Sequence, residues 1–344
     1  AADRASAYVT ECRRRIANMI GAPGEDCVSF HSSGTAALNA AIHGLVRPGD
    51  HVVTTAVEHN SVLRPLTHLH NYHEVALTVV PCNREGLVDA SEVLDAVQPN
   101  TKMVAVTHIS NVTGASQPIE EIGFALEKRD VAFLCDAAQS FGYVPIDVTQ
   151  LHVDLLAAPG HKGGEGPLGT AMLYCDPQWH SDLCSTIQGG TGSRSESLLM
   201  PGYMPDKLEA GNLNVPAIVG RNAGLAELTE SKLLATTSRF FELSASLYRR
   251  LSKIPHVNVI GSPDVLPLVS VTIEGLPASD VAVVLDAEFS IETRAGFHCA
   301  ALIHQYIGTV HDGTLRISAG RHTTDEEIDA VVSAIKEIAF EVNE

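Results

Sequence analysis

The chain has 344 residues, of which 45% are hydrophobic, and this length is enough for one large domain and a smaller one. Its formal net charge of −18 argues against a nucleic-acid partner, because binding to phosphates favours a basic surface. No apolar run approaches the ~18 residues of a membrane-spanning helix, and the first residues lack the apolar stretch of a secretory signal, so we expect a cytoplasmic protein with no membrane partner.

Short apolar runs alternate with helical patterns from about residue 25 to residue 175. The apolar runs predict strands at Cys27–His31, His51–Thr55, Ala76–Pro81, Met103–Thr107, Val131–Cys135, Leu155–Ala158 and Thr170–Tyr174. The periodic segments between them predict helices at Thr35–Leu45, Ser61–Asn71, Ala90–Val97 and Ile119–Lys128. This alternation predicts an α/β fold, with a mostly parallel sheet that has helices on both faces and binds ligands at the carboxyl ends of its strands.

The second half of the chain has a different pattern. Residues 189–214 are rich in glycine, serine and proline and predict a long functional loop, and a long helical pattern follows over about 216–251. Further strands are predicted at Val257–Ile260, Leu268–Ile273 and Thr314–Ser318, with helices at Ala278–Ala287 and Asp325–Val342. We therefore predict a large domain over residues 16–215 and a smaller C-terminal α/β domain over 216–344, joined by the long helix, with residues 1–15 packed near the smaller domain.

The seven cysteines are odd in number and scattered, and no pair has the C-x-x-C spacing. This argues against a disulfide framework and against a zinc cage, so we expect no metal site. Cys299 has a distinct setting, since the segment RAGFHCAA predicts a short mobile loop. Arg294 and His298 in that segment favour the nucleophilic thiolate of Cys299, and a buried inert cysteine is the alternative.

Lys162 follows the apolar run Leu155–Ala158 and lies in the glycine-rich turn GHKGG, and Asp136 follows the apolar run Val131–Cys135. Neighbouring parallel strands would deliver this amine and this carboxylate to the same edge of the sheet. Such a pair suits pyridoxal phosphate (PLP), because the amine forms a Schiff base with its aldehyde and the carboxylate keeps its pyridine nitrogen protonated.

Other side chains at the same edge fit this cofactor. The motif SSGT precedes a helix, so Gly34 and Thr35 suit a phosphate, although an ordinary helix cap has the same composition. His59 follows a strand, where it can stack on a flat ring and exchange protons with it, and a surface or capping histidine is the alternative. Gln139 lies close enough to Asp136 in sequence to reach the phenolic oxygen of the same ring.

Two residues suit a substrate carboxylate. Asn111 follows a strand in HISNVTG, and its amide can donate to a carboxylate or to the phenolic oxygen; a turn asparagine is the alternative. Arg316 lies inside the apolar strand TLRIS, and a buried arginine needs an anionic partner. A carboxylate gripped by both guanidinium nitrogens satisfies it, and a structural salt bridge is the competing explanation.

These segments resemble the class V aminotransferase superfamily of fold-type I PLP enzymes, and within it the cysteine desulfurases and selenocysteine lyases. The resemblance runs from about Cys27 to the C-terminus. It rests on ordered motifs: SSGT, EHNSVLRP, HISNVTG, DAAQSFG, GHKGGEGPLGT, GGTGSRSE, LEAGNLN, RAGFHC and LRISAGRHTTDEEID. It implies the fold of that class, which has a seven-stranded, mostly parallel sheet and a smaller C-terminal α/β domain.

The resemblance implies roles residue by residue. The implied catalytic residues are Lys162, Cys299 and His59. The implied PLP contacts are Gly34, Thr35, His59, Asp136, Gln139, His161 and Lys162, with Asn111 and Arg316 on the substrate's carboxylate. Related enzymes are homodimers with the site near the subunit interface, so Thr191 and Asn212 would serve the partner's phosphate.

The sequence departs from the family pattern in three places. Pro159 stands where a serine or threonine often contacts the phosphate, and it has neither a hydroxyl nor an N–H. Asn212 stands where a threonine is usual. Family members also have several dozen residues before the point that matches the start of this sequence, and that segment covers the mouth of the site.

The implied reaction converts L-cysteine to L-alanine, with the sulfur held on Cys299 as a persulfide and passed to an acceptor protein or a thiol. Alternatives on the same scaffold are a selenocysteine lyase, which would take L-selenocysteine, a cystine or cysteine C–S lyase, and a class V aminotransferase in which Cys299 is incidental. A PLP-binding scaffold without turnover is an alternative from a different class of protein.

Overall fold

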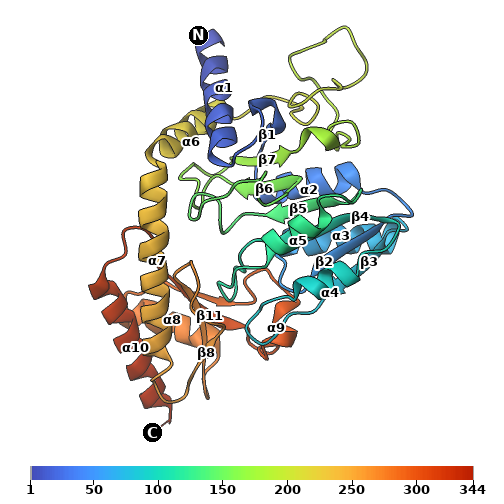
Figure 1. Cartoon of the computed structure of the whole chain (residues 1–344). Helices are drawn as coiled ribbons and strands as arrows, with labels where there is room; N and C mark the ends of the chain where they lie inside the picture. Colours follow the sequence, from blue (N-terminus) through green and yellow to red (C-terminus); the bar gives the residue numbers. More distant parts are fainter. Residues whose placement is uncertain (1, 344) are drawn as a thin grey trace.

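The computed structural model describes residues 2–343 (Figure 1). Its helices are α1 (Ala2–Met19), α2 (Gly34–Leu45), α3 (Asn60–Tyr72), α4 (Ala90–Asp95), α5 (Ile119–Leu126), α6 (Val215–Glu227), α7 (Glu230–Leu251), α8 (Ala278–Phe289), α9 (Ile303–Tyr306) and α10 (Asp325–Asn343). Its strands are β1 (Val28–His31), β2 (His51–Thr55), β3 (Ala76–Val80), β4 (Thr101–Thr107), β5 (Ala132–Asp136), β6 (Leu155–Pro159), β7 (Ala171–Cys175), β8 (Val257–Ile260), β9 (Leu268–Ile273), β10 (Arg294–Gly296) and β11 (Thr314–Ser318).

The larger sheet has seven strands in the order β1-β7-β6-β5-β4-β2-β3, and it is mostly parallel, as predicted. Strand β5 pairs in parallel with β4 and β6, whereas β7 runs antiparallel to both β6 and β1. Along β4 and β5 the buried side chains alternate between two apolar cores: Val104 and Phe133 belong to one, and Met103 and Leu134 to the other. Because both faces are covered, these strands are continuous apolar runs in the sequence.

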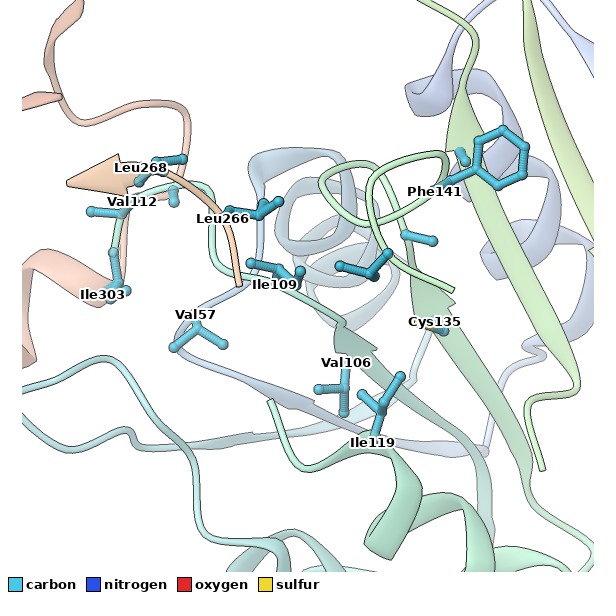
Figure 2. Close-up of a cluster of buried hydrophobic side chains, with 14 of the residues drawn as sticks. Val57, Val106, Ile109, Val112, Ile119, Cys135, Phe141, Leu266, Leu268 and Ile303 are labelled. Carbon is cyan, nitrogen blue, oxygen red and sulfur yellow. The ribbon is translucent and has the colours of Figure 1, made fainter. Parts of the chain in front are cut away.

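Helices α2 and α3 supply the core on one face of this sheet, through side chains such as Ile42 and Leu66. The core on the opposite face extends into the C-terminal part of the chain, where β10-β11-β9-β8 form a second, four-stranded sheet. Figure 2 shows this continuity, since Leu268 of β9 and Ile303 of α9 lie beside Val112, which follows β4. Within residues 2–343, no helix has the length and apolarity needed to cross a membrane.

The long helix expected over about 216–251 is two helices, so that part of the prediction is wrong. Helix α6 ends at Glu227, and Leu228 leaves the helical conformation with φ −86° and ψ 66°. Thr229 then begins α7, because its side chain accepts a hydrogen bond from the backbone N–H of Lys232. Helix α7 runs down one side of the molecule from the larger sheet to the C-terminal sheet (Figure 1).

The N-terminal helix α1 packs against α6. Arg13 of α1 pairs with Glu209 at 2.7 Å and donates to the backbone oxygen of Val28, so α1 is also tied to the edge of the larger sheet. The boundary near residue 215 and the place of residues 1–15 stay predictions, since one apolar core joins both sheets.

We expect Leu247→Ala in α7 to lower the free energy of unfolding by about 2–5 kcal/mol, because this side chain is fully buried and its removal leaves a cavity. Leu234→Ala makes the same change in the same helix at a side chain that is 52% exposed, and it should cost less than ~1 kcal/mol. Thermal and denaturant unfolding of both variants measure the difference. Equal losses would contradict the packing described for α7.

Candidate active site

Asp136 and Lys162 face one cavity at the carboxyl ends of β5 and β6. Asp136 is the last residue of β5, where it pairs with Ala157 of β6, and Lys162 lies in the turn that follows β6. Both side chains line a cavity of about 260 Å³. Burial raises the pKa of Asp136 while the charge of Lys162 lowers it; burial lowers the pKa of Lys162 while Asp136 raises it.

A hydroxyl and imidazole network joins the start of α2 to the start of α3. Thr35 Oγ1 lies 2.8 Å from Ser61 Oγ, and Ser61 Oγ lies 2.9 Å from His59 Nδ1. The backbone N–H of Ser61 also donates to His59 Nδ1 at 3.0 Å, which places the proton of the neutral ring on Nε2. Burial, then the charges of Lys162 and Arg294, lower the pKa of His59 to about 4, so the ring is neutral at pH 7.

Glu58 lies fully buried behind this network and ties together the strand ends that carry the site. Its Oε1 accepts hydrogen bonds from Thr55 Oγ1 at 2.7 Å and from the backbone N–H of Thr107 at 2.9 Å. Thr107 Oγ1 lies 3.4 Å from the backbone oxygen of Asp136. Burial raises the pKa of Glu58 to about 8, and its Oε2 has no partner among residues 2–343.

Two arginines face each other across the second sheet. Arg294 of β10 and Arg316 of β11 are register partners in an antiparallel pair. Arg316 Nη1 donates to the backbone oxygen of Asn111 at 2.9 Å, and its buried Nε has no partner in the described part of the chain. No carboxylate of residues 2–343 forms an ion pair with Arg316, which removes the structural salt bridge as an explanation. Like charges opposite each other are destabilising, so this pair favours a bound anion.

Cys299 is exposed beside these arginines, and Arg294 Nη2 lies 3.5 Å from its sulfur. Its backbone oxygen accepts from the N–H of Asn60 at 2.6 Å, and the backbone oxygen of His298 accepts from Asn111 Nδ2 at 2.6 Å. These contacts hold both residues at positive φ, 48° for His298 and 59° for Cys299. The segment predicted as a mobile loop is therefore anchored.

His298 does not act on Cys299 as the sequence led us to expect. Its buried ring lies against Thr314, with Nε2 at 3.0 Å from the backbone oxygen and 2.9 Å from Oγ1. Burial and the charge of Arg316 lower its pKa to about 3, so it carries no positive charge at pH 7. Of the two cations proposed to act on Cys299, only Arg294 contacts the sulfur.

Comparisons with known proteins show the family to which this chain belongs. The aminotransferase class-V family model matches residues 1–331. A relative from Methanothermobacter thermautotrophicus, named "Probable cysteine desulfurase", is 33% identical over 98% of this chain and 85% of the relative. The cysteine desulfurase IscS of Methanosarcina thermophila is 31% identical over 95% of this chain and 80% of its own. The chain belongs to the cysteine desulfurase group of the class-V aminotransferase family.

Solved structures of this family have the same fold. The apo structure of cysteine desulfurase from Thermococcus onnurineus NA1 has a TM-score of 0.91 and 29% identity, and the match covers 98% of this chain and 85% of that one. The cysteine desulfurase CsdA from Escherichia coli also has a TM-score of 0.91, with 26% identity over 99% of this chain and 86% of that one.

Most of the predicted cofactor and substrate residues of this class-V aminotransferase lie around one cavity. Its lining includes Gly34, Thr35, His59, Asn111, Asp136, Gln139, His161 and Lys162. Arg316 and Cys299 are not part of this lining but adjoin it through Arg294, which is. Thr191 and Asn212 lie apart from it, together in a separate hollow beside α1. Pro159 also lines the cavity, and a Cβ on Gly34 would come within 3.3 Å of its Cδ, so this proline packs under the start of α2.

Glu58 and Ser61 were not among the predicted site residues, and Arg294 was predicted to act on Cys299 but not to line this cavity. Glu58 and Ser61 lie within the EHNSVLRP motif. Their polar side chains, so close in sequence to His59, were the feature that could have indicated a place in the site. Arg294 begins the RAGFHC motif, but its place opposite Arg316 requires the strand register. No set of three or more histidine, cysteine or acidic side chains within residues 2–343 is arranged to hold a metal ion.

The pH dependence of stability tests the buried carboxyl of Glu58. Its pKa is raised from 4.5 to about 8, so the stability that the neutral form provides is present at low pH and is lost as pH rises through about 8. The amide in Glu58→Gln cannot ionise. We therefore expect the unfolding midpoint of the wild type to fall relative to that of Glu58→Gln between about pH 5 and about pH 9.

Thermal unfolding of both proteins across that pH range measures this difference. Glu196→Gln removes an exposed carboxylate and is the control, since it should give a pH profile parallel to that of the wild type. Parallel profiles for the wild type and Glu58→Gln would show that Glu58 is ionised in the folded protein.

Proposed function

We propose that this protein is a PLP-dependent cysteine desulfurase that converts L-cysteine to L-alanine and receives the sulfur on Cys299 as a persulfide. The observation that carries the proposal is the arrangement of three groups. The half-buried amine of Lys162 and the carboxylate of Asp136 line one cavity, and the exposed thiol of Cys299 lies 3.5 Å from Arg294 Nη2, which belongs to the same lining. The names of the relatives support the same activity.

The residues present fit PLP. The start of α2 presents the backbone N–H groups of its first turn, at Gly34 and Thr35, to a phosphate, and Asp136 is a buried carboxylate suited to a protonated pyridine nitrogen. The amine of Lys162 forms no hydrogen bond or ion pair within residues 2–343, so it is available to an aldehyde. His59 would lie on the ring and Gln139 near its phenolic oxygen, since both line the cavity.

When bound, PLP takes up the amino group of the substrate and withdraws electrons from its Cα. The residues of the protein act first on the substrate's carboxylate. Arg316 would bind it through Nε, which has no partner within residues 2–343, and Arg294 lies opposite in the strand pair. Lys162 moves the Cα proton. Burial lowers its pKa, which increases the fraction of the neutral amine that can accept a proton.

Sulfur transfer then takes place at Cys299. Its thiolate forms an S–S bond with the substrate's sulfur as the Cβ–S bond breaks, and the electron pair of the broken bond stays with the carbon fragment. That fragment takes up protons and leaves as alanine. Asn111 positions Cys299 for this step, because its side-chain amide donates a hydrogen bond to the backbone oxygen of the preceding residue, His298. The persulfide is passed to an acceptor protein or a thiol.

We also propose a homodimer. Thr191 and Asn212 lie in a hollow away from Lys162, so they reach a phosphate only if that phosphate belongs to another copy. The loop that carries Thr191 extends away from the body of the chain (Figure 1) and exposes Leu198 and Leu199, which a second copy would cover.

Borohydride reduction of the PLP-loaded protein should attach the cofactor to Lys162, since this half-buried amine lies near Asp136 and makes no hydrogen bond or ion pair within residues 2–343. Peptide mass spectrometry locates the adduct. Lys162→Arg should abolish it, whereas Lys207→Arg, which changes a lysine bonded to the backbone oxygen of His180, should leave it in place. An adduct on another lysine would overturn the assignment.

Cys299→Ala should lose the persulfide and at least ~100-fold of the alanine formed from L-cysteine, because the nucleophile is removed. The control is Cys184→Ala, since Cys184 is the other exposed cysteine among residues 2–343 and it lies outside the cavity. Alanine assays and mass spectrometry of the Cys299 peptide give the readouts. Pyruvate and ammonia as products would favour a C–S lyase, and transfer of the amino group to a keto acid would favour an aminotransferase.

A further inference from the structure

Arg321 lies just beyond the end of β11 and reaches across to the larger sheet. Its Nη2 donates to the backbone oxygen of Gly142 and lies 3.4 Å from that of Gly163, and its Nη1 pairs with Glu165. The guanidinium also lies over the ring of Tyr143, 5.5 Å from its centre. The side chain is only 16% exposed, so these contacts are made largely out of water.

The two backbone segments under this guanidinium carry the two key groups of the cavity. Gly142 ends the DAAQSFG segment, which begins at Asp136, and Gly163 directly follows Lys162. They touch backbone to backbone: a Cβ on Gly142 would lie 2.0 Å from the oxygen of Gly163. Only glycine allows this approach, which brings two carbonyl oxygens to the same side.

We propose that Arg321 is a positioning residue that clamps the segment after Asp136 to the turn that holds Lys162. Two carbonyl dipoles pointing to one place repel each other. Here one guanidinium nitrogen, Nη2, reaches both oxygens, and Nη1 of the same planar group pairs with Glu165. The expected change in kcat rests on the proposed function. The tie that Arg321 makes between the two backbone segments does not depend on it.

The clamp also links the two ends of the site. Arg316, which would bind the substrate's carboxylate, and Arg321 belong to one short segment of chain, formed by β11 and the residues after it. The charges that act on Lys162 come from Asp136, Arg316, Arg294 and Cys299. The contacts of Arg321 are with the backbone on either side of the cavity groups, so its proposed effect on Lys162 is exerted through the backbone of the turn.

Arg321→Lys tests the clamp, because it keeps the charge and loses the fork of donors. With PLP bound, we expect the midpoint pH of the cofactor's absorbance change to shift by ~0.5 unit or more. We expect kcat with L-cysteine to fall about 10-fold or more and KM to stay within about 2-fold, because the lysine is misplaced and substrate contacts are kept. Amide hydrogen exchange of peptides covering residues 138–145 and 160–168 should become faster.

Two further variants make the test specific. Glu165→Gln removes the ion pair and keeps the carbonyl contacts, so its effects should be smaller than those of Arg321→Lys. Arg239→Lys makes the same change at an arginine on the surface that pairs with Asp325, four residues after Arg321. It should match the wild type in every readout.

An absorbance midpoint, kcat and hydrogen exchange for Arg321→Lys equal to those of the wild type would overturn the proposal. A lower melting temperature with an unchanged midpoint and kcat would also overturn it, since it would show a purely structural tie. If the wild type itself makes no alanine or persulfide, the proposed function fails, and the absorbance midpoint and hydrogen exchange still decide whether the clamp exists.

Discussion

The opposition of a buried carboxylate and a half-buried amine is the constraint on which the rest of this structure depends. The parallel pairing of β5 with β6 brings Asp136 and Lys162 to one cavity, and there each charge offsets the burial that disfavours the other. Much of the surrounding structure keeps them in place: Glu58 ties the strand ends, and Arg321 bridges the two backbone segments that follow.

The larger sheet was predictable because its inner strands, such as β5, β6 and β7, are buried on both faces, which makes each one a short apolar run between turns. The site was predictable for a related reason. Residues such as His59, Asn111 and Asp136 each follow a strand, and the carboxyl ends of parallel strands meet at one edge. The break between α6 and α7 was not predicted, since apolar periodicity continues across it and only the hydroxyl of Thr229 marks the new start.

Features that depend on pairing between distant segments could not be read from the sequence. The meeting of Arg294 with Arg316 follows from the register of β10 and β11, and β10 is too short to give a strand pattern. The charge state of His298 follows from burial against Thr314, whereas its neighbours in sequence indicated a cation. Thr191 and Asn212 line a hollow beside α1 instead of the cavity at Lys162, and the packing of their loop is not given by the motifs that contain them.

The anchoring of Cys299 sets a condition on the proposed release of its sulfur. The backbone N–H of Asn60 holds the carbonyl of Cys299, and the side-chain amide of Asn111 holds the carbonyl of His298, so the backbone that carries the thiol is tied on both sides. On the proposed function, a recipient would therefore collect the sulfur where the thiol stands. The shape of the surrounding rim would then govern which recipients can be loaded.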